Sequence, residues 1–169
     1  MTYQRFEDLP VWQSAIQLAE GVYALTEAKP FELQRSLSDQ IERAAVSVSN
    51  NIAEGFERGT TKELLAFIYI ARGSAGEVRS MLCLIERLPR FRNLKSQISD
   101  LKSKAESCSR QLRGWAASLQ DSPIAGPRRL NTAIRQEAEQ KKRAEAFLKK
   151  LKTEYKLAPF PSAKPTPPE

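Results

Sequence analysis

The residue types that most often carry catalysis are scarce in this chain of 169 residues. It contains no histidine, which removes the commonest general base, the Ser–His and Cys–His nucleophile pairs and most zinc or haem sites. Its two cysteines, Cys83 and Cys108, lie within apolar helical patterns and lack the spacing of a metal site. We expect both thiols to be reduced and buried, and we expect a protein that is not an enzyme and holds no metal or cofactor.

A series of polar side chains recurs at helical spacing between residues 40 and 54. Steps of three or four residues separate its members, which places them along one face of a helix. The polar stripe consists of Gln40, Arg43, Ser47, Asn51 and Glu54. If the next helix returns antiparallel after a turn near residue 58, Arg43 lies level with residues 74–77 and Ser47 with residues 70–73. Polar groups buried at such a contact are costly unless they satisfy one another.

Three roles are open for the polar stripe. It can be an internal network of hydrogen bonds and ion pairs that fixes the helix register, a contact with a ligand or RNA, or an oligomer interface. In the first role, Arg43 and Glu77 are predicted partners, directly or through Gln40 or Ser74, because a buried guanidinium needs a carboxylate. A catalytic role for Glu54 or Glu77 is disfavoured, since no second acid, base or metal ligand converges with either.

The segment Gly73-Ser74-Ala75-Gly76 has a Gly-x-x-Gly spacing that suggests a phosphate-binding loop. It falls in the middle of a helical pattern, however, where the backbone N–H groups are already bonded to preceding carbonyls and cannot cradle an anion. The small residues are therefore predicted to allow close helix–helix approach.

The charge of the chain points to a polyanionic partner. There are 27 Lys and Arg residues against 20 Asp and Glu, a formal net charge of +7, and the excess is concentrated in residues 87–113 and 121–169. This distribution favours RNA or another nucleic acid as a partner, although solvated helix faces that keep the protein soluble remain an alternative. The candidate nucleic-acid-binding residues are Arg87, Arg90, Arg92, Lys95, Lys102, Lys104, Lys141, Lys142, Arg143, Lys149 and Lys150.

Four long helical patterns must position these residues. Apolar residues recur every three to four positions over about residues 9–27, 32–58, 61–88 and 91–119. Asp8 is predicted to cap the first helix, and Thr60 with Glu63 forms a capping box before the third. Because the connecting loops are short, the pattern predicts an all-α, antiparallel, up-down-up-down four-helix bundle.

The chain is predicted to continue beyond the bundle of residues 1–120. Residues 121–129 have the Gly, Pro and Ser content of a linker, and residues 130–157 are expected to form a basic C-terminal helix. Residues 158–169 are Pro-rich and are expected to be disordered. No apolar run long enough to span a membrane occurs, and the N-terminus lacks the apolar middle of a signal peptide. We therefore expect a cytoplasmic protein without a membrane partner.

Several of these residues together resemble a known family. The matching segments are Phe6-x-x-Leu9-x-Val11-Trp12, Pro30-x-Glu32, Gln40-Ile-Glu-Arg43-Ala-Ala-x-Ser47-x-x-x-Asn51-Ile-Ala-Glu-Gly55, Lys62-Glu63 and Ala71-x-Gly73-Ser74-x-x-Glu77. They resemble the four-helix-bundle family encoded by intervening sequences in bacterial 23S rRNA genes. More distant relatives are the accessory variability determinants of diversity-generating retroelements. The resemblance covers about residues 5–119.

The resemblance implies a four-helix protomer, assembly into a homopentamer, no enzymatic activity and a role in binding nucleic acid. Together with the charge, it predicts a non-enzymatic oligomer that binds RNA, such as rRNA or the intervening-sequence RNA, through basic surfaces. The alternative is a protein–protein adaptor, for example a retroelement accessory protein that binds a reverse transcriptase and its template RNA.

Overall fold

The computed structural model describes residues 3–120, 140 and 143–150 of the chain. Two compact units divide the chain, Met1–Arg128 and Arg129–Glu169. All regular secondary structure in the described residues is helical, without a β-strand, which confirms the all-α class. In the second unit, residues 143–150 are helical and exposed. The expected linker and the expected Pro-rich tail lie outside the described residues.

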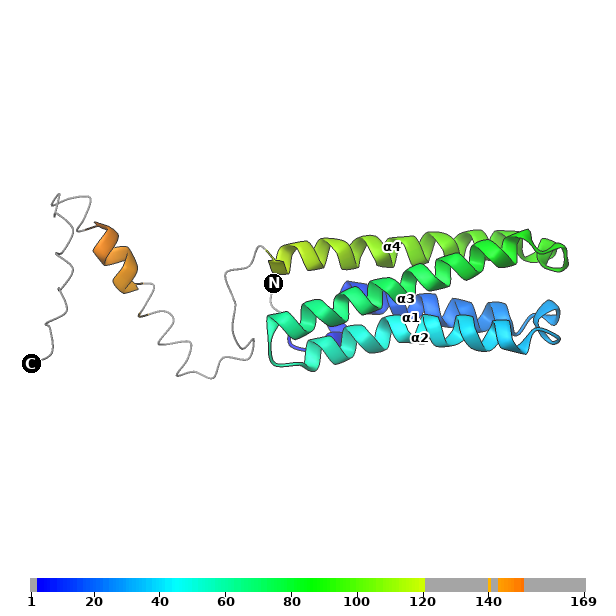
Figure 1. The fold of residues 1–169 in the computed structure, drawn as a ribbon, viewed down its shortest axis with the longest axis horizontal. Coiled ribbons are helices and arrows are strands. Elements are labelled where there is room, and N and C mark those ends of the chain that lie inside the picture. Colours follow the sequence, from blue (N-terminus) through cyan, green and yellow to red (C-terminus); the bar gives the residue numbers. More distant parts are fainter. Residues whose placement is uncertain (1–2, 121–139, 141–142, 151–169) are drawn as a thin grey trace, which may run out of the picture. The chain divides into compact units, whose positions relative to one another are not determined.

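The first unit consists of four long helices that lie side by side (Figure 1). They are α1 (Pro10–Thr26), α2 (Arg35–Glu57), α3 (Thr61–Arg87) and α4 (Lys95–Gln120). Short 3₁₀ turns at Phe6–Asp8, Lys29–Phe31 and Pro89–Leu94 precede α1, α2 and α4. Consecutive helices run in opposite directions (Figure 1), with α2 packed on α3, α3 on α4, and α1 on both α2 and α4. All four helices therefore share one apolar core, to which each contributes fully buried side chains such as Leu18, Ile52, Ile68 and Ile98.

The N-cap predicted from the sequence is present at α3 but not at α1. The N-cap half of the α3 capping box is confirmed, because Thr60 Oγ1 accepts a hydrogen bond from the Glu63 N–H at 3.2 Å, whereas the Glu63 carboxylate meets the Thr60 hydroxyl rather than the Thr60 N–H. The Thr60 hydroxyl in turn donates to the Glu63 carboxylate at 2.7 Å. The predicted cap of α1 by Asp8 is wrong: Asp8 belongs to a 3₁₀ turn, Leu9 is the N-cap residue, and its side chain makes no capping bond.

The two loops at one end of the unit are held together by an aromatic contact. Phe31 and Phe91 are both fully buried, and their ring centroids lie 4.6 Å apart. Each ring belongs to a 3₁₀ turn, one before α2 and one before α4. This long-range contact explains why α2 and α4 begin a few residues later than the periodicity predicted: the preceding residues turn inwards to place the rings in the core.

The cysteines behave as small apolar residues. Cys108 is fully buried on α4, and burial raises the pKa of its thiol to about 11. Cys83 is half-buried on α3, and both thiols are free. At neutral pH the Cys108 thiol is therefore protonated and packs in the core as a small apolar side chain.

Within one copy of the chain, α2 and α3 approach each other closely at Gly55. A Cβ added at Gly55 on α2 would lie 2.6 Å from Phe67 Cβ on α3, so the two backbones can meet only because residue 55 lacks a side chain. A Cβ added at Gly73 or Gly76 would meet no atom within 4 Å. Within one copy the glycine pair therefore meets no other helix, because both glycines face outwards on α3, whereas Ser74 and Ala75 between them are buried.

We expect Gly55→Ala to lower the free energy of unfolding by about 1–3 kcal/mol, since the new methyl group would overpack the α2–α3 contact. Gly114→Ala on α4 is the matched control, because a Cβ there meets nothing within 4 Å. It should leave stability unchanged or raise it by up to about 1 kcal/mol through helix propensity. Urea denaturation of the two variants makes the comparison, and equal effects would contradict the assignment of Gly55.

Candidate functional site

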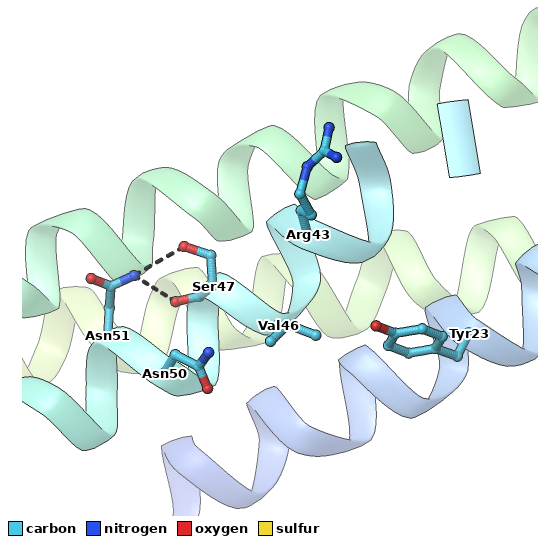
Figure 2. A pocket seen from close by; sticks show the side chains of 6 residues that line it. All are labelled: Tyr23, Arg43, Val46, Ser47, Asn50 and Asn51. Carbon is cyan, nitrogen blue, oxygen red and sulfur yellow. Dashed lines mark hydrogen bonds between the residues drawn. The ribbon is translucent and has the colours of Figure 1, made fainter. Parts of the chain in front are cut away.

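The centre of the polar stripe is a chain of hydrogen bonds across the α2–α3 contact. Asn51 Nδ2 donates to the backbone oxygen of Ser47 at 2.7 Å and to Ser47 Oγ at 2.9 Å (Figure 2). Ser47 Oγ and Ser74 Oγ lie 2.9 Å apart, and the Ser74 hydroxyl donates to the Ile70 carbonyl at 3.1 Å. Because the Ser74 hydroxyl donates its one proton to the Ile70 carbonyl, the Ser47 hydroxyl is the donor in the bond to Ser74 Oγ. This chain fixes the register of α2 on α3, and places Ser47 one residue beyond the level predicted for it.

The outer part of the stripe does not join this network. Gln40, Arg43 and Glu77 are exposed. None of the three side chains has a hydrogen-bond or ion-pair partner within residues 3–120, 140 and 143–150. The predicted pair of Arg43 with Glu77 is therefore wrong. Its premise was a buried guanidinium, and an exposed one is solvated by water and needs no carboxylate.

Glu54 and Gly55, which end the motif segment Gln40–Gly55, stabilise the turn between α2 and α3. The Glu54 carboxylate accepts a hydrogen bond from Arg58 Nη2 at 2.6 Å and thereby raises the pKa of Arg58. The Arg58 guanidinium also lies over the Phe67 ring, 5.3 Å from its centroid. Because the Glu54 and Arg58 side chains are about half exposed, the ion pair contributes little stability. Its effect is to hold Arg58 over Phe67, the residue on which Gly55 packs.

An open hollow of about 470 Å³ lies beside the polar stripe. It is lined by Tyr23, Arg43, Val46, Ser47, Asn50 and Asn51. Figure 2 shows the Arg43 guanidinium turned towards α3, away from the Tyr23 ring on α1. The polar atoms of the hollow therefore do not converge on one point, as a reacting group would require. In the part of the chain that the structure describes, no group of three His, Cys, Asp or Glu residues could hold a metal ion.

Four of the basic candidates gather at one end of the first unit. Arg87 ends α3, Arg90 and Arg92 lie in the 3₁₀ turn after it, and Lys95 begins α4. All four side chains are exposed, and none forms an ion pair with any residue in the described ranges. Their guanidinium and ammonium groups are therefore available to a ligand outside the chain.

Sequence reasoning missed two further members of this cluster. Lys29 and Arg35 are exposed and flank the turn whose Phe31 packs on Phe91, which brings them to the same end of the unit. The aromatic contact joins two loops that are far apart in the sequence, so no local pattern signals it. The basic end is defined here as Lys29, Arg35, Arg87, Arg90, Arg92 and Lys95. Its segments, residues 27–35 and 86–95, hold six basic residues against three acidic ones.

The remaining basic candidates have different surroundings. Lys102 Nζ donates to Glu86 Oε2 at 2.8 Å, and this bond lowers the pKa of Glu86, with Lys95 and Arg87 adding to the effect. Lys104 is exposed on α4. In the second unit, Arg143, Lys149 and Lys150 are exposed on a helical segment, whereas Lys141 and Lys142 lie outside the described residues.

A family model described as 23S rRNA-intervening sequence protein matches residues 7–114. The matched range includes the whole polar stripe, the glycine pair of α3 and the basic end, and it stops before the expected linker. No curated protein sequence matches the chain. Among the residues that the structure describes, no helix is both long enough and apolar enough to cross a membrane.

The serine pair gives a test of the register network. We expect Ser47→Ala and Ser74→Ala each to lower the free energy of unfolding by about 0.5–1.5 kcal/mol, because each removes one side of the bond between α2 and α3. The double variant should lose less than the sum of the two, by about 0.5 kcal/mol or more, since the second change removes nothing further from that bond. Urea denaturation measures all three. Ser103→Ala, which removes only an exposed bond within α4, is the control. Strictly additive losses would contradict the network.

Proposed function

The chain belongs to the 23S rRNA-intervening sequence protein family, and on this premise we propose that it is a non-enzymatic, self-associating four-helix-bundle protein that binds RNA. The basic end of the first unit is its RNA contact. The observation that carries the proposal is the group Arg87, Arg90, Arg92 and Lys95, which is exposed and forms no ion pair with any described residue. The nearby Glu86, whose pKa Lys95 and Arg87 help to lower, is itself bonded to Lys102.

The chemistry of the basic end suits the phosphate backbone of a nucleic acid. Four of its six residues are arginines, whose planar guanidinium groups can donate two parallel hydrogen bonds to one phosphate. The buried contact of Phe31 with Phe91 holds both loops on the core, so their charges need little reordering when they bind. Positively charged groups release counterions from RNA, which makes such binding strongly dependent on salt.

The same geometry argues for contacts to phosphates rather than to bases. The aromatic rings of the two basic loops, Phe31 and Phe91, are fully buried, so these loops offer no ring on which a base could stack. Phosphate contacts position a nucleic acid but carry no sequence information. The protein is therefore expected to bind structured RNA with modest sequence selectivity.

Self-association is supported by the apolar run at the centre of α3. Ile68 and Ala71 are buried in the core, but Tyr69 and Ile70, which lie between them, are exposed. A helix that is apolar on more than one side calls for cover on more than one side, and a single copy covers only one. Assembly also joins several basic ends in one particle, so that weak phosphate contacts add through avidity.

We expect Arg90→Gln combined with Arg92→Gln to weaken RNA binding and to flatten the dependence of log K on log salt. The slope should fall by about one for each residue that contacts a phosphate. Arg110→Gln with Arg113→Gln is the matched control, because it removes the same charge from α4 roughly 22 Å or more from Lys95 along the helix axis. Fluorescence anisotropy of a labelled RNA hairpin at several salt concentrations measures both. Equal losses in the two variants would mean that only net charge matters.

The C-terminal basic zone gives a separate test. Deleting residues 121–169 removes more basic than acidic residues, so we expect RNA affinity to fall and the salt slope to flatten. The first unit should stay folded, because its core is complete within residues 3–120. Circular dichroism checks the fold, and the same anisotropy assay measures binding. Unchanged affinity and slope would assign no RNA contact to this zone.

A further inference from the structure

The outer face of α3 is unusually poor in charge for a helix surface in contact with water. Helical spacing places eight exposed residues between positions 66 and 84 on one face, over about five turns. This outer face of α3 consists of Ala66, Tyr69, Ile70, Gly73, Gly76, Glu77, Ser80 and Leu84. Glu77 is its only charged residue. A solvent-facing helix surface is normally rich in charged side chains, so its composition resembles a contact surface.

The face also leaves large apolar side chains in water. Tyr69 is 43% exposed, Ile70 51% and Leu84 52%. The large exposed hydrophobic residues within residues 3–120 are Tyr3, Tyr23, Leu33, Tyr69, Ile70 and Leu84. Half of them therefore lie on this one face. Such grouping, unlike scattered single residues, marks an interaction surface.

The two glycines of this face have no role within a single copy. A glycine weakens a helix relative to alanine, and at Gly55 and Gly21 that cost is offset by a close neighbour, 2.6 Å from an added Cβ in each case. At Gly73 and Gly76 an added Cβ would meet nothing within 4 Å. Both lie on the apolar face between Ile70 and Leu84, where the missing side chains would let another helix come close.

The charges beside the face indicate what covers it. The Ser47–Ser74 bond sets α2 and α3 level, and Arg43 and Glu77 lie about one turn from these serines in the same direction. Both residues are exposed without a partner among the described residues. A carboxylate as the only charge repels RNA phosphates, whereas a second copy of the chain brings an arginine for Glu77 and a glutamate for Arg43.

We propose that the outer face of α3 is the surface through which copies of this chain associate, with Gly73 and Gly76 admitting the neighbouring copy and Arg43 of one copy pairing with Glu77 of another. This proposal rests on the self-association in the proposed function and is independent of RNA binding at the basic end. Arg43, Gly73 and Glu77, which belong to the family motif but not to the hydrogen-bond network between α2 and α3, would thereby act in self-association.

Charge reversal tests the pairing between copies. The mass of the wild type by light scattering should exceed the 19.0 kDa of one chain. Arg43→Glu and Glu77→Arg should each shift the mass towards that of the monomer, because each places like charges at the contact. Mixing the two variants in equal amounts should restore association, since residue 43 of either variant then meets an opposite charge at residue 77 of the other. A pairing confined to one chain would show no such rescue.

The other outcomes of the light-scattering experiment contradict either the proposed self-association or its assignment to the outer face of α3. A monomeric wild type would overturn both this proposal and the proposed self-association. An associated wild type whose single variants keep their mass would overturn this surface alone, and so would dissociated variants that the mixture fails to rescue. If Arg43→Glu kept its mass but bound the labelled RNA hairpin more weakly, the face would be a nucleic-acid contact and the proposal would be wrong.

A bulky residue at the glycine pair tests the close approach. Gly76→Leu adds a side chain where the single copy has free space, so helicity and cooperative thermal unfolding should persist while association is lost. Gly114→Leu is the matched control, because Gly114 is an equally open glycine but lies on α4. Retention of the wild-type mass by Gly76→Leu, or equal dissociation of both variants, would overturn the assignment to α3.

Discussion

The contact between α2 and α3 is the constraint on which the rest of the structure depends. At its turn end Gly55 lets the two backbones meet at Phe67, and further along it Ser47 and Ser74 are hydrogen-bonded. A close approach fixes the distance between the helices, and a directional bond fixes their register. Apolar packing alone would tolerate a slide of one helix past the other more easily, because it is not directional. With α2 and α3 locked, α1 and α4 have a defined surface on which to complete the core.

The contact between α2 and α3 also divides the motif residues into two groups. Ser47, Asn51 and Ser74 face the neighbouring helix and satisfy one another, so they stabilise the protomer. Arg43 and Glu77 lie about one turn away, on the exposed rim of the same contact. The polar stripe of α2 and the facing positions of α3 thus carry both a structural network and a pair of outward charges. Spacing places these residues at the contact of the two helices, but it does not reveal which of them reach solvent.

What could be predicted from the sequence follows the range of the interactions. Helix periods and the Thr60 N-cap depend on residues a few positions apart, and these predictions are confirmed. The late starts of α2 and α4 depend on Phe31 meeting Phe91, which no local pattern indicates. The same contact brings Lys29 to the basic end. Glycines give a related example: a small residue permits close approach, but its neighbour is a property of the fold, so the sequence does not reveal that Gly55 meets Phe67 while Gly73 and Gly76 meet nothing within one copy.

The two proposed functions, RNA binding and self-association, fall on surfaces of opposite character, the basic end and the outer face of α3. The basic end presents cations without ion pairs on loops that the core holds in place. This suits contact with the regularly spaced phosphates of a nucleic acid, without recognition of its bases. The outer face of α3 is nearly uncharged, and its single carboxylate disfavours the same partner. Because the two surfaces differ in this way, the proposed association at α3 would not compete with the proposed RNA contact. It would instead raise the number of basic ends that one RNA meets, so that weak phosphate contacts add through avidity.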